Sequence, residues 1–202
     1  MSIATKVKKS AITQYRRNLR SAVRALWLGV MDFDQAFDAF QSAINRGLNR
    51  AWIEGAKECD IKPEEFTSAE QTERDKFIQE QINHISPFLL EVEANNKASG
   101  GKLTPQFKRV QLWTNQYSSL VQVASAMTCE NLKKIWVLGV VEKHCTTCQR
   151  LAGKVKRNSF WLTHVVPRNG PNPNLECRGF NCHCELVTTD KPISRGPLPR
   201  TP

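Results

Sequence analysis

Apolar residues recur at three- and four-residue steps through the first two thirds of the chain. The stripes run over residues 12–30, 33–52, 78–92 and 110–127. This spacing places the apolar side chains on one face of an α-helix and the polar side chains on the other. Because each helix must bury its apolar face, the pattern predicts helices that pack as a bundle within residues 1–131.

Capping residues and prolines mark where these helices begin and end. Thr67 and Glu70 have the spacing of a capping box and predict the start of a helix. Pro87 is expected to kink or split that helix, because proline removes a backbone hydrogen bond. Thr104 and Pro105 fit the N-cap and the first position of the last long helix.

The pattern changes near residue 133. The segment IWVLGVVE, residues 135–142, is rich in β-branched and apolar residues, which predicts a buried strand. Residues 151–155 predict a glycine turn and a second short strand, and residues 182–189 predict a third. Prolines and asparagines exclude regular structure over residues 167–175.

These elements predict a mainly α protein with a small α+β module near the C-terminus. The last twelve residues hold four prolines, which favours an extended tail. The expected parts are a helical domain (1–131, with a basic N-terminal helix over 1–30), a Cys-rich module (132–190) and the tail (191–202).

The net charge of +10 is distributed unevenly along the chain. Residues 1–24 contain seven basic residues and no acidic one, and residues 133–202 carry a net charge of +8. The middle of the chain is acidic, with a net charge of −5. Basic ends favour contact with a polyanion or an acidic protein surface, and the alternative is that they serve solubility.

The sequence gives no indication of a membrane protein. No apolar run approaches the roughly 20 residues that span a bilayer. The N-terminus also lacks the apolar core and the cleavage site of a secretory signal. We therefore expect a protein of the cytoplasm.

Five of the seven cysteines fall into two short runs. Cys145-x2-Cys148 comes first, and Cys177, Cys182 and Cys184 follow about thirty residues later. Two such groups can supply the four thiolates of a structural zinc site, so four of these five cysteines are the expected ligands. Disulfides and free or redox-active thiols are the alternatives.

One cysteine of the five is more than a zinc ion needs, so the ligand set stays open. Cys177 can replace another ligand or stand free, and His144, His164 and His183 are possible substitutes. The other two cysteines, Cys59 and Cys129, lie on expected helices, where buried packing is the usual role.

Enzymatic activity is not expected. A zinc-containing nuclease or toxin-like effector remains an alternative, because His164, His183 and the nearby asparagines (Asn169, Asn172, Asn174) are the residue types that a His-Asn-His nuclease uses. The acidic-or-His plus His dipeptide of such enzymes is missing from the first strand. A DNA-binding zinc module is a further alternative.

The Cys-rich module resembles that of phage head morphogenesis proteins, the minor head proteins similar to phage Mu protein F. The resemblance covers residues 133–190. It rests on Cys145-Thr-Thr-Cys148, Leu151-Ala-Gly153-Lys-Val155, a Pro-rich loop and Cys182-His-Cys184 in that order. Many family members have a histidine three residues before the first cysteine of the last motif. Gly179 stands at that position here, and Cys177 is the candidate replacement.

The resemblance implies a low-copy structural protein of the virion. Such a protein would be assembled in the host cytoplasm, would lie inside the head near the portal, and would act in head assembly or DNA delivery. The portal protein, other capsid components and packaged DNA are the partners that the resemblance implies.

Overall fold

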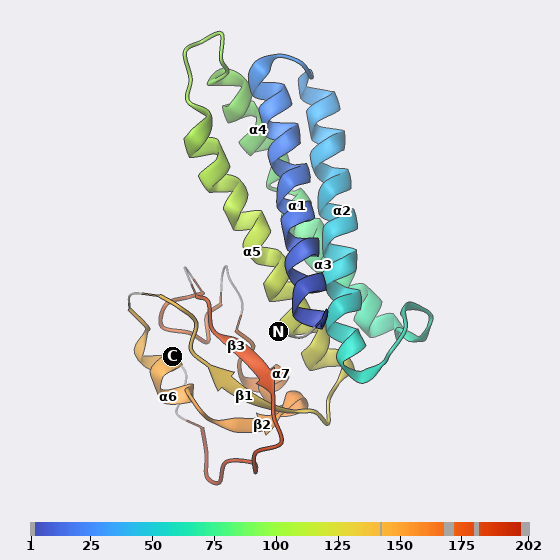
Figure 1. The fold of residues 1–202 in the computed structure, drawn as a ribbon, viewed down its shortest axis with the longest axis vertical. Helices are drawn as coiled ribbons and strands as arrows, with labels where there is room; N and C mark the ends of the chain where they lie inside the picture. Colours follow the sequence, from blue (N-terminus) through green and yellow to red (C-terminus); the bar gives the residue numbers. More distant parts are fainter. Residues whose placement is uncertain (1–2, 142, 168–171, 180–181, 199–202) are drawn as a thin grey trace. The chain divides into compact units, whose positions relative to one another are not determined.

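The computed structural model describes residues 3–141, 143–167, 172–179 and 182–198. Long helices make up most of it, and a small three-stranded antiparallel sheet lies in the C-terminal third (Figure 1). The predicted fold class, mainly α with a small α+β module, is confirmed. Within these residues, none of the helices combines the length and the apolar character that a bilayer crossing requires.

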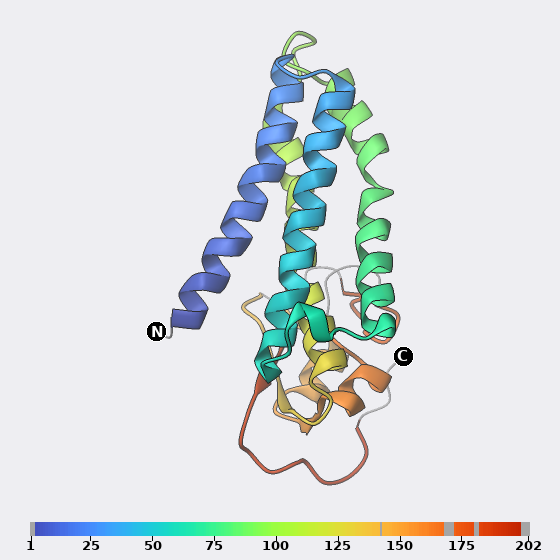
Figure 2. The ribbon, with the colours of Figure 1, turned by 90° about the vertical axis from the view of Figure 1, so that its right-hand side faces the viewer.

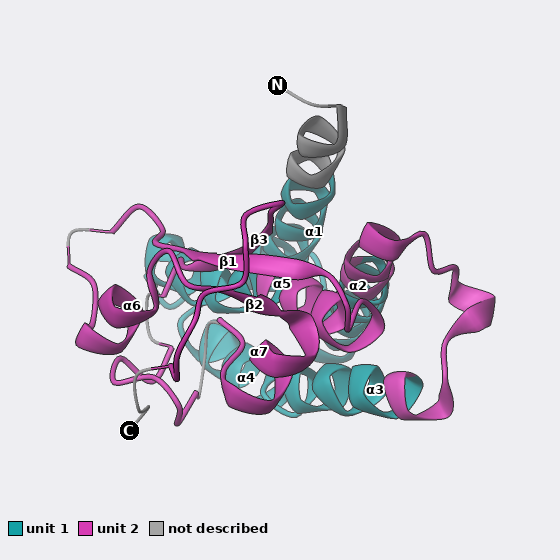
Figure 3. Ribbon diagram, turned by 90° about the horizontal axis from the view of Figure 1, so that it is seen from below, with its two compact units in different colours: residues 1–50, 71–117 teal, residues 51–70, 118–202 magenta. Residues whose placement is uncertain are grey.

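The chain divides into two compact units (Figure 3). The first contains residues 1–50 and 71–117, and the second contains residues 51–70 and 118–202. The boundary that we expected after residue 131 lies inside the second unit. The ends of two long helices therefore group with the Cys-rich module, and the carbonyl of Ser125 accepts a hydrogen bond from the side-chain amide of Asn158 at 2.9 Å.

The helices of the structure follow the predicted stripes. Figure 2 shows α1 and α2 side by side in the first unit. The bounds of the five long helices are α1 Ile3–Leu28, α2 Phe33–Ala56, α3 Ser68–Ile82, α4 Ile85–Ala94 and α5 Leu103–Thr128.

Local hydrogen bonds explain where these helices begin. The amide of Gln35 donates to Oδ1 of Asp32 at 2.8 Å, which caps α2. The predicted capping box is also present, because the amide of Thr67 donates to Oε2 of Glu70 at 2.7 Å. Pro87 lies in the first turn of α4, so the predicted third helix is split in two.

Aromatic side chains form much of the core of the first unit. Phe40 of α2, Phe88 of α4 and Trp113 of α5 meet with ring centroids 5.0–5.9 Å apart. Tyr15 of α1 lies 5.9 Å from Tyr117 of α5 by the same measure. All five side chains are buried, so aromatic contacts join α1, α2, α4 and α5.

The sheet of the second unit has the order β2–β1–β3. Its strands are β1 Lys133–Val137, β2 Val155–Arg157 and β3 Glu185–Thr188, and β1 pairs antiparallel with both neighbours. Two short helices, α6 Thr146–Leu151 and α7 Asn158–His164, connect the strands and were not predicted. Trp136, Leu151, Trp161 and Leu186 form the centre of the apolar core beside the clustered cysteines.

The first strand is shorter than predicted. The prediction of a strand over residues 135–142 is wrong over residues 138–141, because β1 ends at Val137, and residue 142 lies outside the described residues. Leu138 packs against the core, whereas Val140 is fully exposed. Past the end of β1, the amide of Gly139 lies close enough to the sulfur of Cys184 to lower the pKa of that thiol.

Cys59 and Cys129 form a disulfide, which corrects the expectation that they only pack in the core. Cys59 ends the short helix η1 (Lys57–Cys59), and Cys129 follows α5 directly. A second short helix, η2 (Pro63–Glu65), lies between η1 and α3. The sequence separates the two cysteines by 70 residues, so no local pattern indicates their pairing.

The C-terminal tail is extended but held against the module. The amide of Ser194 donates to the carbonyl of Val155 at 3.0 Å. The ammonium of Lys156 donates to the carbonyls of Ser194 and Gly196. Leu198 packs against the core cluster. The tail therefore covers the free edge of β2, and its last residues, 199–202, lie outside the described residues.

Candidate metal centre

The turn after β1 brings the first cysteine pair close to the last one. A Cβ atom on Gly139 would lie 2.0 Å from the carbonyl oxygen of His183. Only glycine allows this approach, because real Cβ atoms are not found at such distances. The segment after β1 thus lies directly against Cys182-His-Cys184.

The Cys145-x2-Cys148 pair lies at the N-terminus of α6. Cys145 is the N-cap residue, and its sulfur accepts a hydrogen bond from the amide of Cys148 at 3.4 Å. The next amide, that of Thr146, donates to Oε2 of Glu176 at 2.9 Å. Glu176 precedes Cys177, so this bond ties the first cysteine run to the second.

The second run reaches the site through a turn in the left-handed region. Arg178 and Gly179 have φ angles of 50° and 79°. The amide of Gly179 donates to the sulfur of Cys177. Residues other than glycine rarely adopt this conformation, so the turn after Cys177 depends on Gly179.

All five clustered cysteines converge on Cys148. The sulfur atoms form two groups of three, and within each group they lie within 4.8 Å of one another. One group is Cys145, Cys148 and Cys177, and the other is Cys148, Cys182 and Cys184. Each cysteine is a free thiol, and the three of the second group are all buried. Both groups can hold a metal ion.

The thiols perturb one another strongly. Contacts with Cys182 and Cys184 raise the pKa of Cys148 far above its usual value. Contacts with Cys148 and Cys182, together with the N–H groups of Gly139 and Trp136, lower the pKa of Cys184 to about 2. Several thiolates cannot coexist this closely without a cation, and a bound cation would stabilise all of them.

The indole of Trp136 fits a thiolate site for a second reason. Its buried Nε1 forms no regular hydrogen bond to the described residues. The N–H group nevertheless lies close enough to Cys184 to lower the pKa of that thiol. A sulfur that carries negative charge would give this donor the partner that it otherwise lacks.

No family model, no curated protein and no solved structure matches this chain. The chemistry of the site therefore has to be inferred from its own residues.

The candidate histidines do not join the sulfur atoms. Neither His144, His164 nor His183 belongs to a potential metal-binding group within the part of the chain that the structure describes. His164 instead stacks on Phe160 with ring centroids 3.8 Å apart, at the end of α7. Its Nδ1 lies 3.0 Å from the carbonyl oxygen of Phe160.

The asparagines proposed for a nuclease hold the loop in shape. Asn172 is buried and donates to the carbonyl of Val166 at 2.9 Å. Asn174 donates to the carbonyl of His164 at 2.8 Å. Both amide groups are engaged by the backbone, and Asn169 lies outside the described residues.

Sequence reasoning found the thiols but missed the groups around them. Gly139, Trp136 and Glu176 each contact or position a cysteine, yet they carry no spacing signal in the sequence. The helix that Cys145 begins was also missed. It starts with Thr146 and Thr147, and threonine has a low helix propensity. In a thioredoxin-like motif the helix belongs to a βαβ unit, whereas α6 connects two antiparallel strands, β1 and β2.

Proposed function

We propose that the cysteine cluster binds one structural zinc ion. The observation that carries this proposal is the convergence of five free thiols on Cys148 from two distant runs. Cys148, Cys182 and Cys184 would hold the ion from the buried side, and Cys145 would complete the set. Its sulfur already accepts the amide hydrogen bond that is typical of a zinc knuckle.

Thiolate ligands favour zinc over harder cations such as magnesium or calcium. A site made of four thiolates has no open position for substrate, so it stabilises a fold rather than catalysing a reaction. The module around β1–β3 is small and has a limited apolar core, so a bound metal ion would add much to its stability. In this arrangement Cys177 stays a half-buried thiol beside the site.

We further propose that the protein is a non-enzymatic minor head protein of a tailed phage or prophage. The support is the resemblance of residues 133–190 together with the secondary structure around the motifs. The first pair follows β1, the glycine turn at Gly153 (φ 75°) leads into β2, and Cys184 directly precedes β3. The protein would act inside the head, near the portal, during assembly or DNA delivery.

The zinc proposal is tested by mass. Native mass spectrometry of the purified protein without reductant is expected to show one bound zinc ion per chain. After denaturation, five thiols should react with an alkylating reagent, since Cys59 and Cys129 are paired. Absence of metal, together with further disulfides among the five, would contradict the proposal.

The head-protein proposal is tested by partner and location. Co-expression with the portal protein from the same genome is expected to give a complex, and the chain should be found in purified heads. Failure of both experiments overturns this proposal without affecting the zinc assignment. Cleavage of plasmid DNA with Mg²⁺ or Mn²⁺ that His164→Ala abolishes would favour the nuclease alternative.

A further inference from the structure

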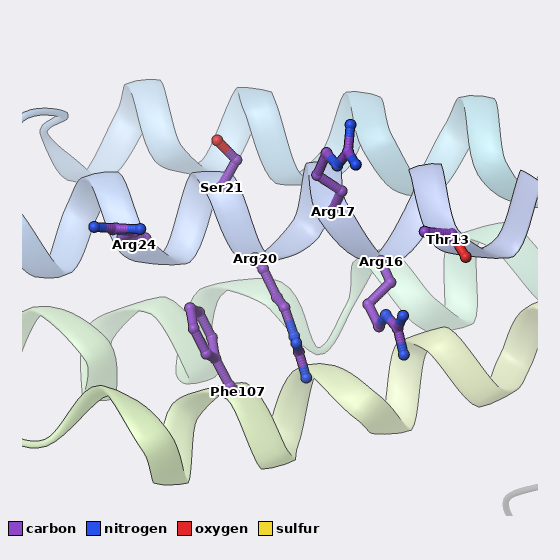
Figure 4. A pocket seen from close by; sticks show the side chains of 7 residues that line it. All are labelled: Thr13, Arg16, Arg17, Arg20, Ser21, Arg24 and Phe107. Carbon is purple, nitrogen blue, oxygen red and sulfur yellow. The ribbon is translucent and has the colours of Figure 1, made fainter. Parts of the chain in front are cut away.

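A groove rich in arginine lies between α1 and α5 in the first unit. Arg16, Arg17, Arg20 and Arg24 of α1 line it together with Phe107 of α5 (Figure 4). Its volume is about 460 Å³. The arginines recur at steps of three and four residues, so the helical period gathers them on one side of α1.

The positive charge of this groove is not neutralised by the fold. Neither α1 nor α5 contains an aspartate or a glutamate. Among the described side chains, no carboxylate pairs with any of the four arginines. Arg109, two residues after Phe107 on α5, is different because it forms an ion pair with Glu91. The groove therefore concentrates uncompensated cations, which favours an anionic ligand.

Arg20 is held in place at the centre of the groove. Its guanidinium carbon lies 5.0 Å from the centroid of the Phe107 ring, in a cation–π contact. Figure 4 shows the side chain extended from α1 toward α5 beside that ring. Its buried Nε has no hydrogen-bond partner in the described structure. A guanidinium that is already held in place loses little entropy when it binds an anion.

The spacing of the arginines fits a linear anion better than a single one. Arg16, Arg20 and Arg24 are four residues apart, and each step advances about 6 Å along the helix axis. Arginine forks match the geometry of phosphate oxygens and bind them in a bidentate manner. The groove offers no carboxylate, and its other lining residues, Thr13 and Ser21, are small.

We propose that this groove binds the phosphodiester backbone of nucleic acid without reading its base sequence. Contacts to phosphate oxygens alone carry no sequence information, which predicts equal affinity for unrelated sequences. The site lies in the first unit and uses no residue of the cysteine cluster. A failure of this proposal would therefore leave the zinc assignment and the portal and purified-head experiments unaffected.

The 202-residue chain is titrated against two labelled DNA duplexes of unrelated sequence, and fluorescence anisotropy is followed between about 50 and 200 mM salt. The triple variant Arg16→Gln, Arg20→Gln, Arg24→Gln should bind less tightly. Its plot of log K against log salt should be less steep by about 2.7, or about 0.9 for each phosphate that the variant no longer neutralises. A matched variant, Lys76→Gln, Lys97→Gln, Lys102→Gln, removes the same charge from exposed sites outside the groove and should keep the steeper slope.

Three results would overturn the assignment. The first is equal slopes for the two triple variants, which would make the effect one of net charge. The second is equally tight binding of poly-glutamate, which would make the ligand an acidic protein surface. The third is no binding by the wild-type protein at the lowest salt. If the triple variant unfolds, Arg24→Gln alone changes an exposed residue, and the slope should fall by about 0.9.

Discussion

Lys134 forms an ion pair with Glu58 in the interior of the second unit. The lysine lies on β1 with a side chain that is only 2% exposed, whereas the side chain of Glu58, on η1, is 32% exposed. Ser125 also donates its hydroxyl to Oε2 of Glu58 at 2.8 Å. One carboxylate thus connects β1, α5 and η1, and it compensates a lysine that has almost no access to water.

This asymmetry predicts which half of the pair matters more. Glu58→Gln leaves a buried ammonium without its counter-charge and should cost about 3 kcal/mol of unfolding free energy, at the lower end for a broken buried pair. Lys134→Met leaves a carboxylate that water can partly reach, so the cost should be smaller. Urea unfolding of both variants measures the two costs.

The double variant Lys134→Met, Glu58→Gln tests whether the two residues are coupled. Its loss of stability should be clearly less than the sum of the single losses, because no unpaired charge remains. Additive losses would mean that the two side chains do not depend on each other.

The disulfide between Cys59 and Cys129 predicts a redox-dependent stability. It closes a loop of 70 residues, for which the chain-entropy argument gives about 4 kcal/mol. The variant Cys59→Ala, Cys129→Ala should unfold at a lower denaturant concentration than the wild type without reductant. Added reductant should lower the wild type to a similar midpoint and leave the variant unchanged.

Metal content separates this effect from the cysteine cluster. The Cys59→Ala, Cys129→Ala variant should keep as much zinc as the wild type, because neither residue belongs to the two thiol groups. An unchanged denaturation midpoint in the variant would show that the two cysteines are not paired in solution.

The long helices could be predicted because their signals are local. Apolar residues of α2 such as Phe40 and Ile44 repeat at helical spacing, and the Thr67 and Glu70 cap has a fixed offset. The prediction of a strand over residues 138–141 was wrong because an apolar, β-branched run resembles a strand whether or not a partner strand is available. Just past the end of β1, Gly139 lies against His183 and Cys184, some forty-five residues later, and no local pattern indicates this contact.

In the candidate site, too, local spacing could be predicted and contacts between distant segments could not. The five cysteines were predictable from pair spacing, and the structure brings them together. That Cys148 is the common member of both groups depends on how α6 meets the loop around Arg178, which no spacing encodes. The Cys59–Cys129 pairing and the arginine groove likewise depend on contacts between distant segments.

The substitution Gly47→Ala should lower the stability of the protein, although helix propensity alone would favour alanine. Within a helix, Gly→Ala usually stabilises by about 1 kcal/mol. A Cβ atom on Gly47 of α2 would lie 2.3 Å from Cδ2 of Tyr15, which is buried in the core. Gly47→Ala should therefore destabilise by about 1–3 kcal/mol, as expected for overpacking.

Arg46→Ala is the matched control for this effect, since Arg46 is the exposed neighbour of Gly47. Its thermal midpoint should stay close to that of the wild type. A Gly47→Ala protein that is more stable than the wild type would show that α1 and α2 are not packed as closely as described.

The cysteines of the cluster are expected to differ in their effect on metal binding. Cys148→Ser should abolish zinc binding, because Cys148 belongs to both thiol groups. With the proposed ligand set, Cys177→Ser should keep about one zinc ion per chain, because it leaves Cys145 and the buried group intact. Metal released into a colorimetric chelator at several pH values measures both variants.

The same measurement gives the pH dependence of metal binding. The pKa of Cys148 is raised by its thiol neighbours, so metal binding must displace its proton, and the affinity for metal should fall as the pH falls. Loss of zinc in Cys177→Ser with retention in Cys145→Ser would exchange these two residues in the ligand set, whereas retention in Cys148→Ser would contradict the site.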